Sequence, residues 1–175
     1  NPFPLPREVL ALPNALALFT DGACRGNPGP GAWAAMAQEH DEEKVPAAQV
    51  IFEASGVDVP TTNNRMELSA ALQGLRLLRD HCIDSGLDLG MPVYIFSDSK
   101  YVLEGLEKWV PGWKARGWKK ADGKAPENME LWKELDLIRA EFEGLRFQWV
   151  KGHNGHPQNE HVDGLANQAL NDAGY

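Results

Sequence analysis

The segment that most constrains the fold is "TTNNRMELSAALQGLRLLRDHC", residues 61–82. Its apolar residues recur at the i, i+3, i+4, i+7 spacing that places them on one face of a helix, at Leu68, Ala71, Leu72, Leu75 and Leu78. Asn63 or Asn64 is predicted to cap this helix, because an Asn side chain accepts a hydrogen bond from a free backbone N–H group of the first turn. A helix with one apolar face is stable only when other elements cover that face, so the rest of the chain must supply a packed layer.

Short apolar and β-branched stretches on both sides of this helix are predicted to form that layer. The predicted strands are residues 15–20, 31–39, 48–56, 91–98 and 145–152, and polar residues 40–44 predict a hairpin connection. Further helices are predicted over residues 99–110, 126–142 and 161–174, the first of them ending before Pro111. The order β-β-β-α-β-α-α-β-α predicts an α/β fold, a five-stranded mixed β-sheet flanked by α-helices.

Length and composition fit one folded domain. A chain of 175 residues with 43% hydrophobic residues can bury a core of ordinary size. Residues 15–175 are predicted to form this single domain, and the proline-rich residues 1–14 an N-terminal extension, the one candidate for a flexible segment. The two cysteines, Cys24 and Cys82, do not suggest a disulfide framework, which favours a reducing compartment and a cytoplasmic location. No stretch approaches the roughly 20 apolar residues of a membrane span, so no membrane partner is expected.

Four acidic residues occupy positions where side chains of different elements can meet. Asp21 and Asp98 each end a predicted strand. Glu67 lies near the start of one helix, beside its apolar stripe, and Asp163 near the start of another, where the positive end of the helix dipole favours an acid. Each acid alone is readily explained as a solvated turn or helix-start residue. Together they would repel one another unless a cation joined them, and carboxylate oxygens suit Mg²⁺ or Mn²⁺. Two such ions about 4 Å apart hydrolyse phosphodiesters, but the sequence alone does not show that the four acids meet.

Four stretches carry a specific resemblance. "FTDGACRGNPGPGAW", "TTNNRMELSAA", "FSDSKYV" and "VKGHNGHPQNEHVDGLAN" resemble the signature stretches of type 1 ribonuclease H, the ribonuclease HI family, in its bacterial form. The segment "WVPGWKARGWKKADGKAPENMELW", residues 109–132, resembles the basic protrusion of that family, and the likeness extends from about residue 15 to residue 172. The resemblance implies a ribonuclease H-like fold and an endoribonuclease that hydrolyses the RNA strand of RNA–DNA hybrids, leaving 5′-phosphate and 3′-hydroxyl ends. A role in DNA replication and repair is expected with it, and a monomer is the default expectation.

The resemblance assigns roles to individual residues. The metal-holding acids of the family match Asp21, Glu67, Asp98 and Asp163, which are expected to bind two Mg²⁺ ions with substrate, or Mn²⁺ in their place. His153 matches the family's mobile loop histidine, which assists proton movement or product release. The flanking Gly152 and Gly155 agree with this role independently, because a flexible loop can bring an imidazole that titrates near neutrality to the site.

Substrate contacts follow from the same resemblance. Residues expected to contact the RNA strand are Gly22, Cys24, Asn27, Asn63 and Lys100. Residues expected to contact the DNA strand are Thr62, Asn64, Trp109, Trp113 and Asn128. The basic protrusion adds Lys114, Arg116, Lys119, Lys120 and Lys124, a local positive charge within a chain of net charge −8. Ala23 and Lys100 depart from the residues that are frequent in the family, serine and glutamine.

Purely structural roles remain as alternatives for several of these residues. Thr62, Asn63 and Asn64 can serve simply as helix caps, the glycine-rich turn as a strand connection, and the tryptophans as core. At the level of function, integrases, transposases and junction resolvases share this type of fold and cut DNA instead. A catalytically silent binder of hybrids is the third hypothesis, although all four acids are present.

Overall fold

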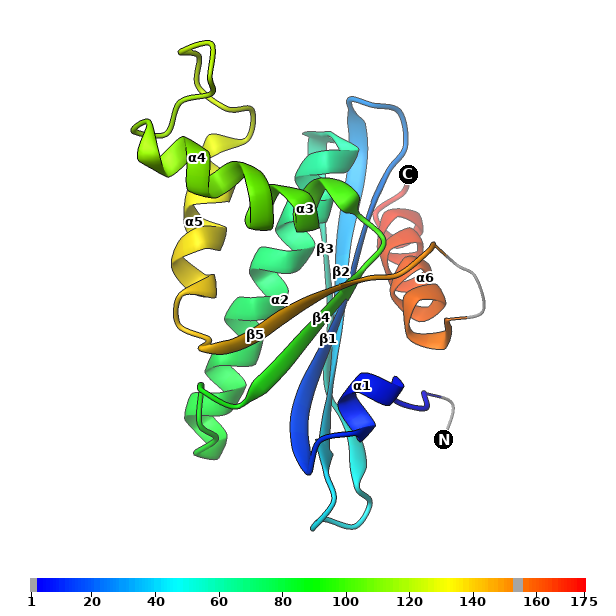
Figure 1. Cartoon of the computed structure of the whole chain (residues 1–175). Helices are drawn as coiled ribbons and strands as arrows, with labels where there is room; N and C mark the ends of the chain where they lie inside the picture. Colours follow the sequence, from blue (N-terminus) through cyan, green and yellow to red (C-terminus); the bar gives the residue numbers. More distant parts are fainter. Residues whose placement is uncertain (1–2, 153–155) are drawn as a thin grey trace.

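The computed structural model describes residues 3–152 and 156–175, and its centre is a five-stranded sheet in the order β3-β2-β1-β4-β5 (Figure 1). The strands are β1 (Asn14–Cys24), β2 (Gly29–Asp41), β3 (Ala48–Thr61), β4 (Pro92–Ser97) and β5 (Gly144–Trp149). Strands β1, β2 and β3 pair antiparallel, whereas β4 runs parallel to both β1 and β5. The prediction of a five-stranded mixed sheet, with a hairpin between the second and third strands, is confirmed.

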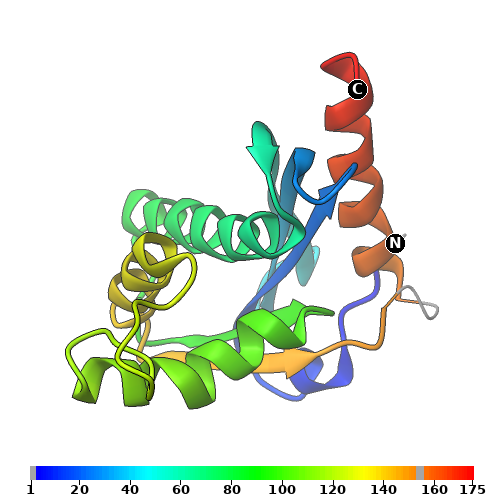
Figure 2. The same ribbon diagram turned by 90° about the horizontal axis from the view of Figure 1, so that it is seen from above.

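Helices cover both faces of this sheet. They are α1 (Arg7–Leu10), α2 (Asn63–Ser85), α3 (Lys100–Glu104), the π-helical turn η1 (Gly105–Trp109), α4 (Val110–Ala115), α5 (Met129–Arg139) and α6 (Pro157–Asp172). Figure 2, seen from above, shows α2, α3, α4 and α5 on one side of the sheet and α6 on the other. None of the helices in the described part of the chain is long and apolar enough to cross a membrane.

Alternation along β1 divides the core into two layers. Leu16 and Leu18 point toward α2 and join a cluster that includes Leu72, Leu75 and the fully buried Trp132. Their neighbours in the strand point the other way, because successive side chains of a strand face opposite sides, and they pack with Val162, Ala166 and Leu170 of α6. The sheet therefore fixes α2 and α6 on opposite faces, so that side chains from both helices can reach the same edge.

The N-terminal residues belong to the core. Leu5 and Val9 are buried in the cluster that α6 forms with the sheet, and β1 begins at Asn14. The buried amide of Gln158 donates to the carbonyl of Pro4 at 2.9 Å and to Gln38 Oε1 at 3.0 Å, and Gln38 donates in turn to the carbonyl of Phe3 at 3.0 Å. The expectation of a flexible extension is wrong for residues 3–13. The prolines suggested a flexible segment, but the apolar residues between them pack against the core.

Several predicted helix boundaries need correction, among them those of α5, which spans Met129–Arg139 and not residues 126–142. Thr62, and not Asn63 or Asn64, caps α2: its Oγ1 accepts from the backbone N–H of Arg65 at 3.2 Å. The helix predicted to end before Pro111 continues through it to Ala115, because the π-helical turn η1 shifts the hydrogen bonding to i→i−5 just before the proline, which has no N–H to contribute. The last helix begins at Pro157, earlier than predicted.

Candidate active site

Asp21 lies where β1 and β4 separate. The parallel pairing of these strands ends at Phe19 and Phe96, whereas the antiparallel pairing of β1 with β2 continues to Cys24. The strand therefore does not stop at Asp21, as the glycines and prolines suggested; only its pairing with β4 stops. Asp98 follows directly after the last residue of β4. Both acids thus lie two residues beyond the point where the parallel pairing of β1 with β4 ends, toward the carboxyl ends of these strands, where ligands bind in sheets of this class.

Helix α2 brings Glu67 to the same edge. The backbone N–H of Gly22 donates to Glu67 Oε1 at 3.1 Å, which ties β1 to the second turn of α2. A Cβ at Gly22 would lie 2.6 Å from the backbone nitrogen of Glu67, so only glycine permits this approach. The glycine that follows Asp21 therefore sets the spacing between the two carboxylates.

Asp163 reaches the site from the other face of the sheet. It lies beyond the first turn of α6, because that helix begins at Pro157. The dipole support expected for a helix-start acid therefore does not apply, since that effect falls off within the first turn. The side chain of Asn167 donates to the carbonyl of Asp163 at 3.0 Å within the helix.

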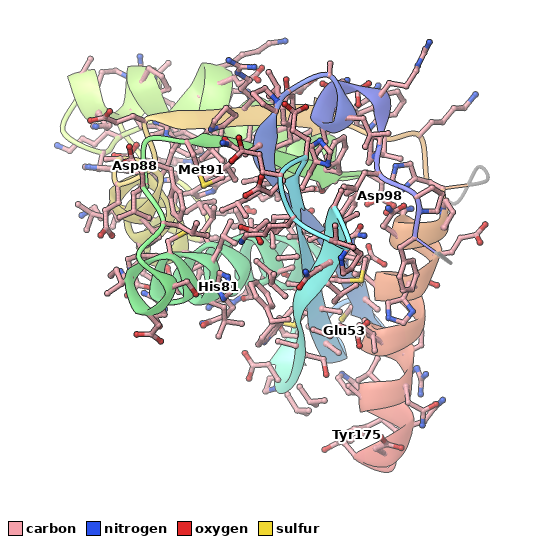
Figure 3. The ribbon with its side chains drawn as sticks, turned by 90° about the horizontal axis from the view of Figure 1, so that it is seen from below. Glu53, His81, Asp88, Met91, Asp98 and Tyr175 are labelled. Carbon is pink, nitrogen blue, oxygen red and sulfur yellow. The ribbon has the colours of Figure 1, made fainter. Side chains whose placement is uncertain are left out.

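The four acids line one cavity. This cavity of about 310 Å³ is lined by Asp21, Glu67, Asp98 and Asp163, with Gly22, Asn63 and Ser99 at its margin. One carboxylate oxygen from each of Asp21, Glu67 and Asp98 lies within 4.8 Å of the others. Figure 3 labels Asp98 near the ribbon that leads from β5 to α6. The structure brings together the four acids that the sequence placed on four separate elements.

Burial and mutual repulsion disfavour ionisation of these acids. Burial first, and then the charge of Asp98, raises the pKa of Asp21 from its usual 3.8 to about 8. Burial, followed by the charge of Asp21, also holds the pKa of Glu67 well above its usual value. Such a cluster binds protons at neutral pH, unless a cation neutralises the carboxylates.

The residues fit a hard divalent cation. Within residues 3–152 and 156–175, Asp21 Oδ2 and Glu67 Oε2 are buried and accept no hydrogen bond. A buried carboxylate oxygen without a donor is costly, and a metal ion satisfies it directly. Because all the ligands are carboxylate oxygens, the set suits Mg²⁺, Mn²⁺ or Ca²⁺ rather than a soft thiophilic metal.

Of the residues expected to contact the RNA strand, Gly22 and Asn63 line the cavity. Asn27, in the glycine-rich turn between β1 and β2, accepts the backbone N–H of Asn63 at 3.1 Å through Oδ1. The turn is thereby fixed against the start of α2. The half-buried thiol of Cys24 lies 2.7 Å from the carbonyl of Gly26 and 3.5 Å from the carbonyl of Thr61, so it contacts both the turn and the end of β3. Lys100 is exposed, with its ammonium 4.6 Å from the ring centre of Trp149.

Three of the residues expected to contact the DNA strand, Thr62, Asn64 and Asn128, lie at the N-termini of α2 and α5. Asn128 adopts a left-handed backbone conformation, accepts from Arg65 at 3.0 Å and donates to the hydroxyl of Tyr101 at 3.1 Å. Thr62 caps α2 next to this group, and Asn64 is exposed on the first turn. Arg65 and Tyr101 could not be recognised from the sequence as the link, because their roles depend on contacts with Asn128.

The basic protrusion stands away from the sheet at the upper left of Figure 1. Trp109 and Trp113 line a cavity of about 180 Å³ with Tyr101, Lys120 and Glu127. Lys119 and Lys124 are exposed, and Arg116 donates to the carbonyl of Lys119 at 3.0 Å. Lys114 instead pairs with Asp136 at 2.9 Å, so its charge is partly neutralised within the protein.

His153 was predicted as a site residue, and Trp149 was not. His153 lies outside the described residues, and its role stays a prediction. Trp149, which the sequence did not single out, donates from its indole Nε1 to the carbonyl of Asp98 at 3.2 Å.

Known proteins are similar to this chain in sequence and in fold. A family model described as RNase H matches residues 13–171. A ribonuclease HI from Caulobacter vibrioides is 46% identical over 158 residues, which cover 90% of this chain and 94% of that protein. Among solved structures, LC9-RNase H1, a type 1 RNase H with the type 2 active-site motif, has a TM-score of 0.74 and 30% identity over 90% of this chain and 72% of that one.

A second solved structure is that of LC11-RNase H1 in complex with an RNA/DNA hybrid. It has a TM-score of 0.64 and 26% identity, covering 90% of this chain and 98% of that one. The family model spans residues 13–171, a range that contains the positions of the four acids, and the bacterial relative matches 90% of the chain. The chain therefore belongs to the ribonuclease H family.

Proposed function

We propose that this chain is a metal-dependent endoribonuclease that hydrolyses the RNA strand of RNA–DNA hybrids and leaves 5′-phosphate and 3′-hydroxyl ends. The observation that carries this proposal is the convergence of Asp21, Glu67 and Asp98 within 4.8 Å, with buried oxygens of two of them lacking a hydrogen-bond donor. Family membership supports the reaction class, and the hybrid bound to LC11-RNase H1 supports the substrate.

The proposed cofactors are two Mg²⁺ ions, with Mn²⁺ as a substitute. Asp21, Glu67, Asp98 and Asp163 would hold them, because these four acids line the same cavity. Bound there, the ions would lower the pKa of the attacking water and neutralise charge on the leaving 3′-oxygen. The raised pKa of Asp21 means that its carboxyl must lose a proton before it can serve as a ligand.

The chain's own residues would orient the hybrid around this cavity. Asn27 and Asn63, held together at its margin, offer amide groups to a 2′-hydroxyl of the RNA strand, the group that distinguishes RNA from DNA. Thr62 and Asn128 would contact DNA-strand phosphates, and Arg65 adds a cation at the same place. The tryptophans and lysines of the basic protrusion would follow the DNA backbone further along. His153 is proposed to assist proton movement or product release.

We further propose a cytoplasmic monomer that acts in DNA replication and repair. Both cysteines are free, which fits a reducing compartment.

Cleavage of end-labelled substrates in Mg²⁺ tests the proposed function. Hybrid, double-stranded RNA and double-stranded DNA of one sequence are compared, and cutting is expected only in the RNA strand of the hybrid. Cutting of DNA would assign the chain to the resolvase and integrase type of activity. Tight hybrid binding with no cutting would make it a silent binder. Either result would overturn the proposal.

A further inference from the structure

An exposed tryptophan joins the carboxylate cluster to the positive charge beside it. Trp149 ends β5 opposite Ser97 of β4, and 45% of its surface is exposed. Its indole N–H donates to the backbone carbonyl of Asp98 at 3.2 Å. The face of the same ring lies 4.6 Å from the ammonium of Lys100. The side chain of Trp149 thus contacts both Asp98 of the carboxylate cluster and Lys100.

The backbone around Asp98 is held from several sides. The N–H of Ser99 donates to Ser97 Oγ at 3.0 Å, and the N–H of Val150 donates to the carbonyl of Ser97 at 2.9 Å. Trp149 adds the contact to the carbonyl of Asp98 itself. A carboxylate that must present its oxygens within a few tenths of an ångström needs a fixed backbone, since supporting contacts determine how well a ligand is oriented.

To bind a phosphate, Lys100 must be held in place by a contact that does not neutralise its positive charge. It is exposed at the first position of α3, and no ion pair with it occurs among residues 3–152 and 156–175. Acidic groups are close in sequence: Asp98 lies two residues before it and Glu104 four residues after it. An indole face attracts an ammonium by its quadrupole and leaves the full positive charge available to a phosphate.

We propose that Trp149 is a positioning residue with two separable roles. Its N–H fixes the backbone of Asp98 for metal binding, and its ring face holds Lys100 beside the cluster for a phosphate of the RNA strand. The second role rests on the proposed function. Beside the ring, a hollow of about 290 Å³ leaves space for a nucleotide to approach this face; its lining carries two lysines and two glutamates and consists of Lys100, Leu103, Glu104, Glu107, Lys108, Phe147 and Trp149.

Two substitutions of Trp149 separate the roles. Trp149→Phe keeps an aromatic face and removes the N–H. It is expected to raise the Mg²⁺ concentration that half-saturates a thermal-unfolding titration without hybrid, by several-fold, while KM for the hybrid at saturating Mg²⁺ changes less than twofold. Trp149→Leu removes both features, and it is expected to raise KM as well, by the same factor of about 2 to 5 as Lys100→Met.

A double-mutant cycle gives the decisive result. In the Trp149→Leu background, Lys100→Met is expected to change KM no further, because the lysine has already lost its position. Lys108→Met is the matched control: this exposed lysine lines the same hollow but does not lie over the ring, so its effect should add to that of Trp149→Leu. Melting temperatures of all variants separate a folding defect from a positioning defect.

The proposal fails if Trp149→Phe leaves the Mg²⁺ midpoint unchanged, or if Trp149→Leu and Lys100→Met raise KM independently. Both outcomes are distinguishable from failure of the proposed function, which would show as absence of hybrid cleavage by the unaltered protein.

Discussion

Gly22 and Glu67 are hydrogen-bonded and in close backbone contact. The N–H of Gly22 donates to Glu67 Oε1 at 3.1 Å, and a Cβ added to Gly22 would lie 2.6 Å from the backbone nitrogen of Glu67. The contact sets how closely α2 approaches β1. Since Asp21 precedes the glycine, it also sets how closely two carboxylates of the cluster approach each other.

Gly22→Ala is expected to displace α2 and to destabilise the protein by about 1–3 kcal/mol, because the atoms in the way are backbone atoms that cannot rotate aside. Mg²⁺ binding should weaken with it. Gly164→Ala is the control, since its Cβ meets nothing within 4 Å on α6 and a helical alanine should stabilise by about 0.5–1 kcal/mol. Chemical denaturation measures the free energy of unfolding of both variants. An unchanged free energy of unfolding for Gly22→Ala would contradict the account.

The pKa of Asp21, raised to about 8, predicts that the metal-free protein loses stability as pH rises. Between the usual pKa of 3.8 and a pH of about 8, the folded state holds a proton that the unfolded state has already released. The free energy of unfolding therefore falls across this range, by up to about 1.4 kcal/mol per pH unit. Thermal unfolding in EDTA at pH 6.5 and 8.5 checks this, and Asp21→Asn should flatten the slope. Added Mg²⁺ should stabilise the protein more at the higher pH. A metal-free protein that gains stability between these pH values would refute the prediction.

The basic protrusion predicts a salt-dependent contribution to hybrid binding. Lys119→Gln combined with Lys120→Gln should raise KM and reduce the slope of log K against log salt by about 1 to 2, because each lysine on a phosphate adds about 0.9 to that slope for duplex DNA. Lys44→Gln, in the connection between β2 and β3 at the opposite end of the molecule, controls for a lost charge (Figure 1). If the slope of log K against log salt is the same in the double variant and the unaltered protein, the hybrid does not bind at Lys119 and Lys120.

The N-terminal segment should contribute to stability through buried amides. Gln158→Ala removes the donor to Pro4 and Gln38 and leaves the buried side-chain oxygen of Gln38 without this partner, at a cost of about 1–3 kcal/mol. Gln168→Ala, exposed on the same helix, should change the free energy of unfolding by less than about 0.5 kcal/mol. Urea denaturation of both variants tests this, and equal stabilities would mean that residues 3–13 are not anchored as described.

The sequence predicted best what depends on local spacing. The apolar residues from Leu68 to Leu78 predicted α2, and the apolar stretch before Asp98 predicted β4. The four acids were predicted as a set through the family resemblance, whereas their convergence depends on strand pairing that no local pattern specifies.

Features that depend on distant contacts could not be predicted. Leu5 and Val9 lie among prolines, so their burial against α6 left no periodic signal. The role of Trp149 depends on the pairing of β5 with β4, and Thr62 and Asn63 are equally good caps until the helix start is known. Pro111 stops most helices, and only the preceding π-helical turn allows this one to continue.

The measurement that tests the central claim most directly compares Asp98→Asn with the unaltered protein on an end-labelled RNA–DNA hybrid in Mg²⁺. The amide keeps the shape of the side chain but removes a charged oxygen from the cluster. Hybrid binding is predicted to stay within about threefold and cleavage to fall by more than about 100-fold, since even residues that merely support a metal ligand contribute 10–100-fold. Appreciable Mg²⁺-dependent cleavage by Asp98→Asn would contradict the claim that these carboxylates hold the catalytic metal.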